Sequence, residues 1–187
     1  MKKAITITFV LLLAAAAVSA EDLTGQMYAT GYVGYALGFG DAFEDYEDEF
    51  SEITVSPTFN LGGQFFYGLK ENIMIGGELY FQNIKAEAKT KAFGGFEGSE
   101  VSNSEFNTNV LANALYAFNH TPEKAMFGIG GIGLYDGDLG LNAGIIYQKA
   151  VSENFTLFGM PRFHMLLSDP SGFILQLSVG ASFPIGS

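Results

Sequence analysis

The sequence predicts an all-β fold, an eight-stranded antiparallel up-and-down transmembrane β-barrel, and three observations carry this prediction. The chain of 187 residues is 48% hydrophobic and 16% charged, yet its net charge is −11. Apolar and polar residues alternate along eight segments with the two-residue period of a β-strand. Glu78 and Arg162 are the only charged residues in those segments, so the acidic charge lies almost entirely in the connections.

The composition excludes several other classes of protein. A helical bundle is disfavoured by 24 glycines, since each costs a helix interior about 1 kcal/mol relative to alanine. The absence of cysteine excludes a disulfide scaffold. The acidic balance argues against a nucleic-acid partner, because phosphate contacts need clustered Lys and Arg. We expect no cofactor, as there is no phosphate-binding glycine loop and no metal-binding histidine pair.

The first 20 residues have the three parts of a secretory signal peptide. Met1-Lys2-Lys3 is a basic head, residues 4–18 are apolar, and Val18-Ser19-Ala20 is a small-residue cleavage site. We therefore predict that residues 1–20 are cleaved and that residues 21–187 form one barrel domain.

The strands are predicted, in chain order, at residues 25–40, 53–69, 73–84, 106–118, 126–135, 139–148, 155–168 and 173–185. The second, fourth and last alternate most clearly; in the last, Phe173, Leu175, Leu177 and Val179 oppose Gln176, Ser178 and Gly180. The fifth is too glycine-rich for its faces to be assigned. Pro57 and Pro161 lie within strands, where a residue without an N–H predicts a bulge or a local break.

The distribution of charge decides which face of the strands meets lipid. A soluble barrel is apolar inside, whereas an outer-membrane barrel is apolar outside. A soluble barrel would also carry charged residues on its outer face, but here the polar face is Asn, Gln, Ser, Thr and Gly. Such small uncharged residues suit a narrow lumen, so we predict that the apolar face contacts lipid.

The connections alternate in length, as in bacterial outer-membrane barrels, where short turns face the periplasm and longer loops face outward. Residues 70–72, 119–124 and 152–154 are short connections, while 41–52 and 85–105 are long. Aromatic residues gather at the periplasmic strand ends, which predicts an interfacial girdle. Its members are Phe65, Tyr67, Tyr116, Phe118, Tyr147 and Phe183.

The final strand resembles the C-terminal signal that the barrel-assembly machinery reads. Ser178, Gly180, Phe183 and Ile185 supply its polar, glycine, aromatic and hydrophobic positions, although Gly186-Ser187 follow where such proteins usually stop. With this strand, the chain resembles the OmpA/OmpX-type eight-stranded outer-membrane barrel family, and it is similar to members that consist of the barrel alone. The resemblance implies a bacterial outer-membrane location, with lipid, lipopolysaccharide and the assembly machinery as partners.

Glu78, Arg162 and His164 are the candidate site residues, because they share the parity of the polar faces and point inward. Ionisable groups inside a membrane usually pair. Counting from the periplasmic strand ends places Glu78 and Arg162 near mid-height. The structural interpretation is an ion pair or a polar plug in the lumen, and the functional alternative is a gate whose partners exchange. His164 lies one inward position above Arg162 and could tune the network.

The long connections are the candidate extracellular binding regions, since exposed loops often carry function. Loop 41–52 is strongly acidic, which could hold Ca²⁺ or Mg²⁺, but its spacing fits no EF-hand, so we predict no specific metal site. Loop 85–105 combines lysines with Phe93 and Phe96 and could serve adhesion, or it could extend a hairpin.

The predicted function is therefore a structural or surface-interaction role in the cell envelope. A narrow channel for small solutes or ions is the alternative. A lipid A-modifying enzyme is a second one, although no catalytic motif is present and we expect no enzyme.

Overall fold

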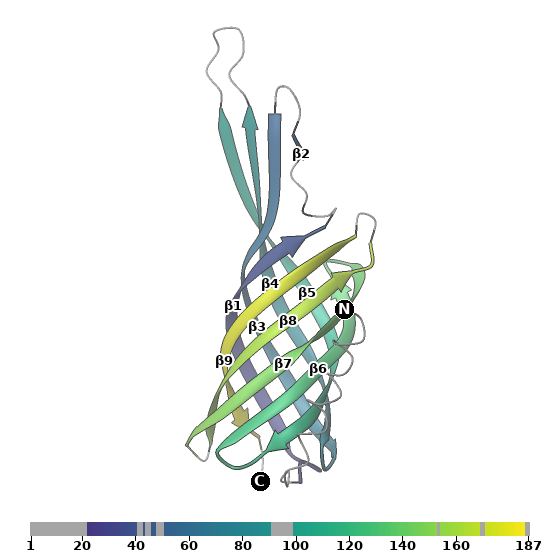
Figure 1. Ribbon diagram of the computed structural model, residues 1–187, viewed down its shortest axis with the longest axis vertical. Coiled ribbons are helices and arrows are strands. Elements are labelled where there is room, and N and C mark those ends of the chain that lie inside the picture. The colour runs from purple at the N-terminus through teal and green to yellow at the C-terminus, as the bar shows by residue number, and fades with distance from the viewer. Residues whose placement is uncertain are drawn as a thin grey trace, which may run out of the picture.

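Eight long strands are hydrogen-bonded edge to edge in a ring in the computed structural model (Figure 1). The structure describes residues 22–40, 43, 46–47, 51–90, 99–152, 154–168 and 171–185. The predicted signal peptide, residues 1–20, lies outside the described residues. The strands are β1 Met27–Phe39, β2 Tyr46–Glu47, β3 Ser51–Lys70, β4 Ile73–Thr90, β5 Glu100–His120, β6 Lys124–Tyr135, β7 Asp138–Ser152, β8 Phe155–Leu166 and β9 Gly172–Pro184.

Each long strand pairs antiparallel with its neighbours in sequence, and β1 closes the ring. One edge of β1 pairs with β9 from Tyr28↔Pro184 to Phe39↔Phe173, and its other edge pairs with β3 from Met27↔Tyr67 to Tyr35↔Phe59. The two-residue β2 is an addition to the outer part of β3. The predicted eight-stranded up-and-down barrel is therefore confirmed.

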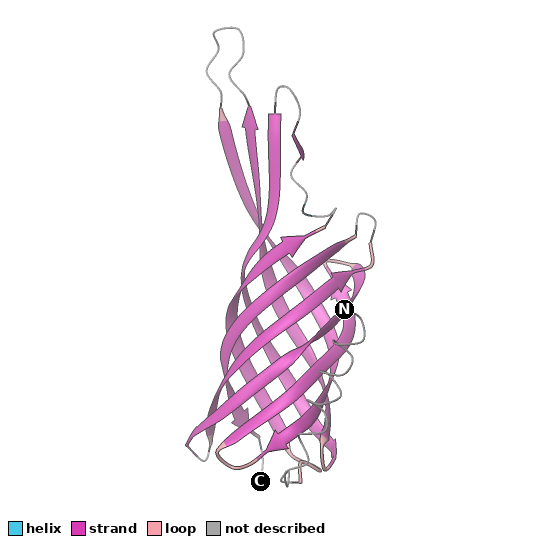
Figure 2. Ribbon diagram, in the orientation of Figure 1, coloured by secondary structure: helices cyan, strands magenta, loops and turns pink. Residues whose placement is uncertain are grey.

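The prediction that residues 85–105 form a loop is wrong for most of that segment, and the alternative that the segment extends a hairpin is confirmed. Strand β4 continues to Thr90 and β5 begins at Glu100, with continuous pairing from Lys89↔Glu100 downward. Figure 2 shows the upper parts of β3, β4 and β5 rising as strands beyond the ring. Charged residues marked this segment as a connection, but charge opposes a strand only where the strand meets lipid. Outside the membrane both faces of a sheet can meet water.

Both prolines interrupt the sheet, as predicted. At Pro57 the pairing of β3 with β4 shifts register before Asn60, which is a bulge. At Pro161 the pairing of β8 with β7 is broken between Gly159 and Arg162, while the pairing with β9 continues through Pro161↔Leu177. A proline cannot donate to the ladder, so each break lies where the missing N–H would be needed.

A two-residue turn joins β6 to β7 at the end that carries the extension. Tyr135 pairs with Asp138, and Asp136 and Gly137 both have positive φ, 53° and 99°. Asp-Gly is a preferred sequence for this kind of hairpin turn, since glycine adopts positive φ without strain.

The outer face of the ring is apolar and the inner face is mixed, which confirms the predicted transmembrane arrangement. Outward side chains such as Val33, Leu79, Val110, Ile132 and Leu177 are exposed, although they are hydrophobic. Phe65, Tyr67, Tyr116, Tyr147 and Phe183 of the predicted girdle are exposed as well. The part of the chain that the structure describes contains no helix with the length and hydrophobicity of a membrane span. Because short turns face the periplasm in such barrels, the end opposite the extension is the periplasmic end.

Candidate functional site

A bidentate ion pair crosses the centre of the barrel. Arg162 on β8 donates from Nη2 to Oε1 of Glu78 at 2.5 Å and from Nη1 to Oε2 at 2.6 Å. Glu78 comes from β4, on the other side of the ring, and both side chains have no exposed surface. The parallel fork of two charge-assisted hydrogen bonds fixes the two groups relative to each other.

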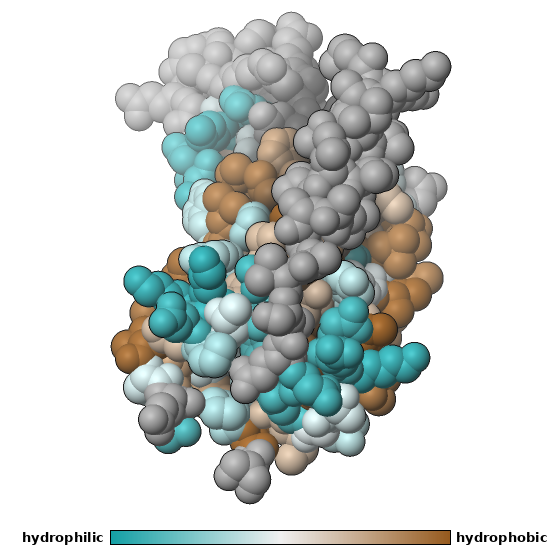
Figure 3. Space-filling view, turned by 60° about the horizontal axis from the view of Figure 1, so that its bottom comes forward, coloured by the Kyte–Doolittle hydropathy of each residue, from teal (hydrophilic) through white to brown (hydrophobic). Residues whose placement is uncertain are grey.

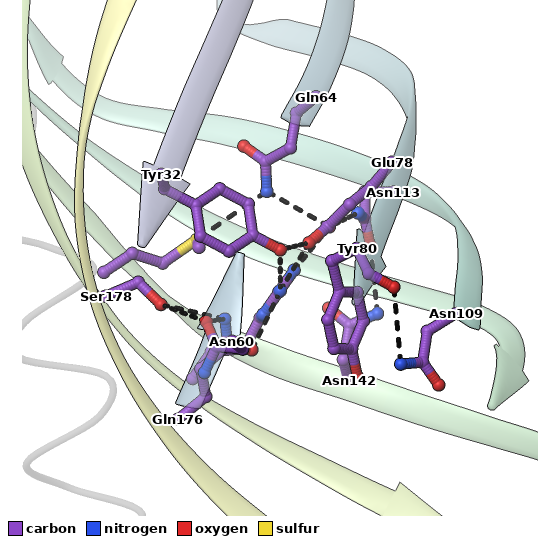
Figure 4. A network of polar contacts seen from close by, with 12 residues as sticks. Tyr32, Asn60, Gln64, Glu78, Tyr80, Asn109, Asn113, Asn142, Gln176 and Ser178 are labelled. Carbon is purple, nitrogen blue, oxygen red and sulfur yellow. Dashed lines mark hydrogen bonds and ion pairs between the residues drawn. The ribbon is translucent and has the colours of Figure 1, made fainter. Parts of the chain in front are cut away.

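Three further side chains donate to the Glu78 carboxylate. Asn113 Nδ2 lies 2.6 Å from Oε2, Gln64 Nε2 lies 3.1 Å from Oε2, and the Tyr32 hydroxyl donates to Oε1. These donors come from β5, β3 and β1 (Figure 4). A buried carboxylate is stable only when its lone pairs are satisfied, so a donor set drawn from several strands compensates for its burial.

The Arg162 guanidinium continues the network to side chains of β9 and β3. Its Nη2 also donates to Gln176 Oε1 at 3.1 Å, and its Cζ lies 5.8 Å from the centre of the Tyr80 ring. Gln176 in turn donates to Asn60 Oδ1 at 3.0 Å and to Ser178 Oγ at 2.8 Å. The network therefore reaches across β8, β9 and β3 without a break.

His164 joins the same network through both ring nitrogens. Nε2 lies 2.6 Å from Gln176 Oε1, and Nδ1 lies 2.8 Å from the Tyr135 hydroxyl oxygen. Since an amide oxygen can only accept, the neutral ring carries its proton on Nε2 and accepts from Tyr135 at Nδ1. The structure thus brings the three sequence-predicted residues together in one buried cluster.

An apolar layer lies below the polar network, toward the periplasm. It consists of buried inward side chains from six strands: Phe66, Met74, Leu115, Phe127, Ile146 and Phe158. The cavity between them has a volume of about 10 Å³. This volume is at the lower limit for a single water molecule, so the apolar side chains leave little room for water between them. Thr30, Gln64, Gln148 and Ser182 line the same cavity, so the expectation of a lumen filled by polar side chains is confirmed only in part for this half of the barrel.

Two vestibules remain open at the ends of the barrel. The extracellular one, about 410 Å³, is lined by Tyr80, Gln82, Asn109, Tyr135, Asp136 and Asp138 among others. The periplasmic one, about 620 Å³, is lined by Gln26, His120, Lys124, Gln148 and Lys149 among others. The polar network and the apolar layer lie between the two vestibules and separate them.

The extension above the barrel carries a strand edge with which no described strand pairs. On the side of β6, pairing of β5 begins at Asn109↔Tyr135, so residues 100–107 have no described strand partner there. The Thr108 carbonyl accepts from Asp136 on the β6 side, whereas Ala117 donates to Asn72 on the β4 side. Along a strand, the N–H and C=O groups of successive residues point alternately to the two neighbouring strands. The register of β5 against β4 is unbroken, so the backbone groups of Ser102, Ser104 and Phe106 point to the same side as those of Thr108, which is the free edge.

The residues that resemble an assembly signal lie on β9 and just after it. Ser178 is part of the lumen network, and Gly180 faces inward, where an added Cβ would lie 2.3 Å from the Gly31 carbonyl. Phe183 is 46% exposed on the outer face, and the Ile185 N–H donates to Met27. Their role in assembly stays a prediction.

Sequence reasoning missed the three tyrosines of the lumen, Tyr32, Tyr80 and Tyr135. Tyr32 shares the parity of Gly34, and Tyr80 that of Glu78, so strand parity was a signal that could have placed both inward. Tyr135 lies on the glycine-rich strand whose faces the alternation leaves open. No group of three or more His, Asp or Glu side chains that could hold a metal ion occurs among the described residues. The acidic loop 41–52 lies mostly outside them.

Comparison with known proteins identifies the fold and nothing narrower. No family model matches the chain. No curated protein matches it either. Among solved structures it is similar to a de novo designed transmembrane β-barrel, with a TM-score of 0.52, 11% identity and coverage of 88% of this chain and 99% of that one. It is also similar to OprG from Pseudomonas aeruginosa, with a TM-score of 0.51, 11% identity and coverage of 90% and 99%.

The fold, the apolar belt and the filled lumen together define the class of protein: the chain is an outer-membrane β-barrel protein. The resemblance to the OmpA/OmpX-type barrels is confirmed at the level of the fold. A bacterial outer-membrane location agrees with this architecture, because closed antiparallel barrels with short turns at one end are the outer-membrane type.

Proposed function

We propose that this protein is a closed outer-membrane barrel that acts by presenting its protruding sheet to an extended polypeptide partner. The single observation that carries the proposal is the free edge of β5 over residues 100–107. An unpaired strand edge is a template for another strand, because its N–H and C=O groups need hydrogen-bond partners. In the extension this edge stands clear of the ring (Figure 1).

The charge of the extension favours a basic partner. Glu52, Glu87, Glu100 and Glu105 lie on its described strands, against Lys85 and Lys89. Added strands gain affinity from main-chain hydrogen bonds and specificity from side chains, so a partner with Lys or Arg at alternating positions complements this edge.

Binding of a synthetic peptide tests the proposal. The probe is a peptide of alternating Lys and Val, and its affinity is measured for the barrel in lipid nanodiscs. Ser104→Pro removes one N–H from the free edge without touching the pairing with β4, whereas Ser104→Ala keeps that N–H. We expect Ser104→Pro to weaken binding on the order of tenfold relative to Ser104→Ala, the loss of one or two hydrogen bonds. Equal binding by the two variants would contradict a strand-addition role.

A narrow channel, the alternative from the sequence, needs a continuous path for water. The Glu78–Arg162 ion pair and the packed apolar layer beneath it both oppose such a path, so we expect no steady conductance in planar lipid bilayers. A steady open conductance from the unmodified protein would overturn the closed barrel. The lipid A-modifying enzyme lacks support as well: His164 bonds Tyr135 and Gln176, and the His120 ring packs on Phe127.

A further inference from the structure

Two lysines face each other across the sheet at the periplasmic end. Lys124 on β6 and Lys149 on β7 are direct partners in the ladder. Both side chains are exposed at the rim of the periplasmic vestibule, and Lys149 also borders a groove on the outside of the barrel. Neither makes an ion pair with a described residue. Like charges directly opposite one another destabilise a strand pair. Lys89 in the extension is the contrast, since it lies between Glu52 and Glu100. Glu123 precedes Lys124 in the chain, but no ion pair joins its carboxylate to either lysine.

A shallow apolar groove of about 790 Å³ begins at Lys149 on the outside of the barrel. Successive partners across the ladder are Lys149, Leu157, Ala181 and Gly31, so the groove crosses β8 and β9 to reach β1. At about 4.8 Å per strand, this run is roughly 14 Å long.

The floor of the groove is made by missing side chains. An added Cβ at Gly31 or Gly159 would meet no atom within 4 Å. Larger outward side chains border this floor, and they include Tyr147, Val179, Val33 and Leu61. The groove is thus a recess in the lipid-facing surface.

The lysine pair lies where a lipid head group would lie. Tyr147 is two residues before Lys149 on the same face and belongs to the aromatic girdle, which marks the membrane interface. Because the strands are tilted, the groove climbs from this level into the apolar belt. In Figure 3 hydrophilic residues gather at the periplasmic end and hydrophobic residues flank them.

We propose that Lys124, Lys149 and the groove form a binding site for one anionic phospholipid of the periplasmic leaflet. The phosphate neutralises the two ammonium groups, and an acyl chain lies along Leu157, Ala181 and Gly31. Lysine near a membrane surface attracts anionic head groups by about 1 kcal/mol per residue. The inference rests on the outer-membrane placement of the barrel, but not on the partner of its extension.

Native mass spectrometry of the full chain in neutral detergent tests the site, with phosphatidylglycerol and phosphatidylcholine of identical acyl chains as probes. We expect retention of phosphatidylglycerol over phosphatidylcholine on the order of tenfold. Lys124→Gln with Lys149→Gln should abolish that preference. Lys85→Gln with Lys89→Gln, an equal loss of charge in the extension, should keep it.

A second pair of variants tests the groove itself. Gly159→Leu fills it and should weaken retention of both lipids severalfold. Gly77→Leu adds the same side chain on the outer face of β4, where an added Cβ has only one contact, at 4.0 Å, and should change nothing. Different migration of heated and unheated samples in SDS gels confirms that each variant is folded.

Equal retention of the two lipids by the unmodified protein, or an unchanged preference in the double lysine variant, overturns the lipid site. Peptide binding at the β5 edge, measured on the same samples, reports separately on the proposed function.

Discussion

Arg162 and Glu78 form a bidentate ion pair, 2.5 Å and 2.6 Å long, between strands on opposite sides of the barrel, and neither side chain is exposed. The pair connects β4 to β8 through the lumen rather than through the sheet. It therefore restrains the cross-section of the ring, and four further side chains, Tyr32, Gln64, Asn113 and Gln176, are oriented by it.

Removing one partner of this pair should cost much of the stability of the barrel. Glu78→Gln leaves the Arg162 charge buried without a counter-ion, which we expect to lower the free energy of unfolding by about 3–5 kcal/mol. Urea unfolding in lipid vesicles measures this loss. Glu87→Gln is the matched control, because it breaks the exposed pair with Lys85 and should cause no measurable change. Equal effects of the two variants would argue against a structural role for the lumen pair.

Gly144 should be sensitive to a single added methyl group. It faces Arg162 across β7 and β8, where an added Cβ would lie 2.5 Å from the Pro161 carbonyl and 2.9 Å from Arg162 Cα. We expect Gly144→Ala to destabilise the barrel by about 1–3 kcal/mol through overpacking. Gly159→Ala on the outer face of β8 meets open space and should stay within about 0.5 kcal/mol in the same unfolding assay. A neutral Gly144→Ala would show that the lumen is looser than this geometry.

Phe183 should be needed for insertion into the membrane more than for the packing of the barrel. Its aromatic ring occupies the position that resembles the assembly signal, and its main ring contact is with Phe155, 5.4 Å between centres. We expect Phe183→Ala to reduce the heat-modifiable form in outer-membrane fractions severalfold. Leu177→Ala, on the same face of β9 and similarly exposed, should leave that amount unchanged. The signal hypothesis is wrong when both variants insert equally well.

The Glu87 carboxyl should titrate below its ordinary range. A hydrogen bond from Lys85 and the charge of that ammonium both lower its pKa. A lowered pKa in the folded state favours folding above the ordinary pKa of glutamate, and this effect is lost as the pH falls through the lowered value. Because the pair is at the surface, the effect is too small for urea unfolding to resolve, and the pKa itself is the quantity to measure.

Nuclear magnetic resonance of the Glu87 side chain measures this pKa directly. Lys85→Gln should raise it toward the ordinary value, whereas Lys89→Gln, whose charge acts more weakly on Glu87, should raise it less. An unchanged pKa in Lys85→Gln would mean that the pair does not persist in water.

The sequence by itself determined the eight-stranded barrel and the orientation of its strand faces. Strand alternation and the absence of charge from eight segments fix which faces meet lipid, since an unpaired charge in hydrocarbon is costly at any position on the outer face. The inward parity of Glu78, Arg162 and His164 could be read in the same way, because a strand alternates with a fixed period of two.

Only the tertiary structure decided which side chains contact one another in the lumen. Counting from the strand ends places Glu78 and Arg162 at similar heights and so allows an ion pair, which the structure contains. Which further side chains join them depends on strand tilt and register around the whole ring. The apolar layer beneath the pair could not be read from alternation either, because Phe66, Leu115 and Phe158 share their inner faces with polar residues. The extension of β4 and β5 could not be predicted from the sequence either. Charged residues disfavour a strand only where lipid surrounds it, and only the assembled barrel shows where the lipid-facing surface ends.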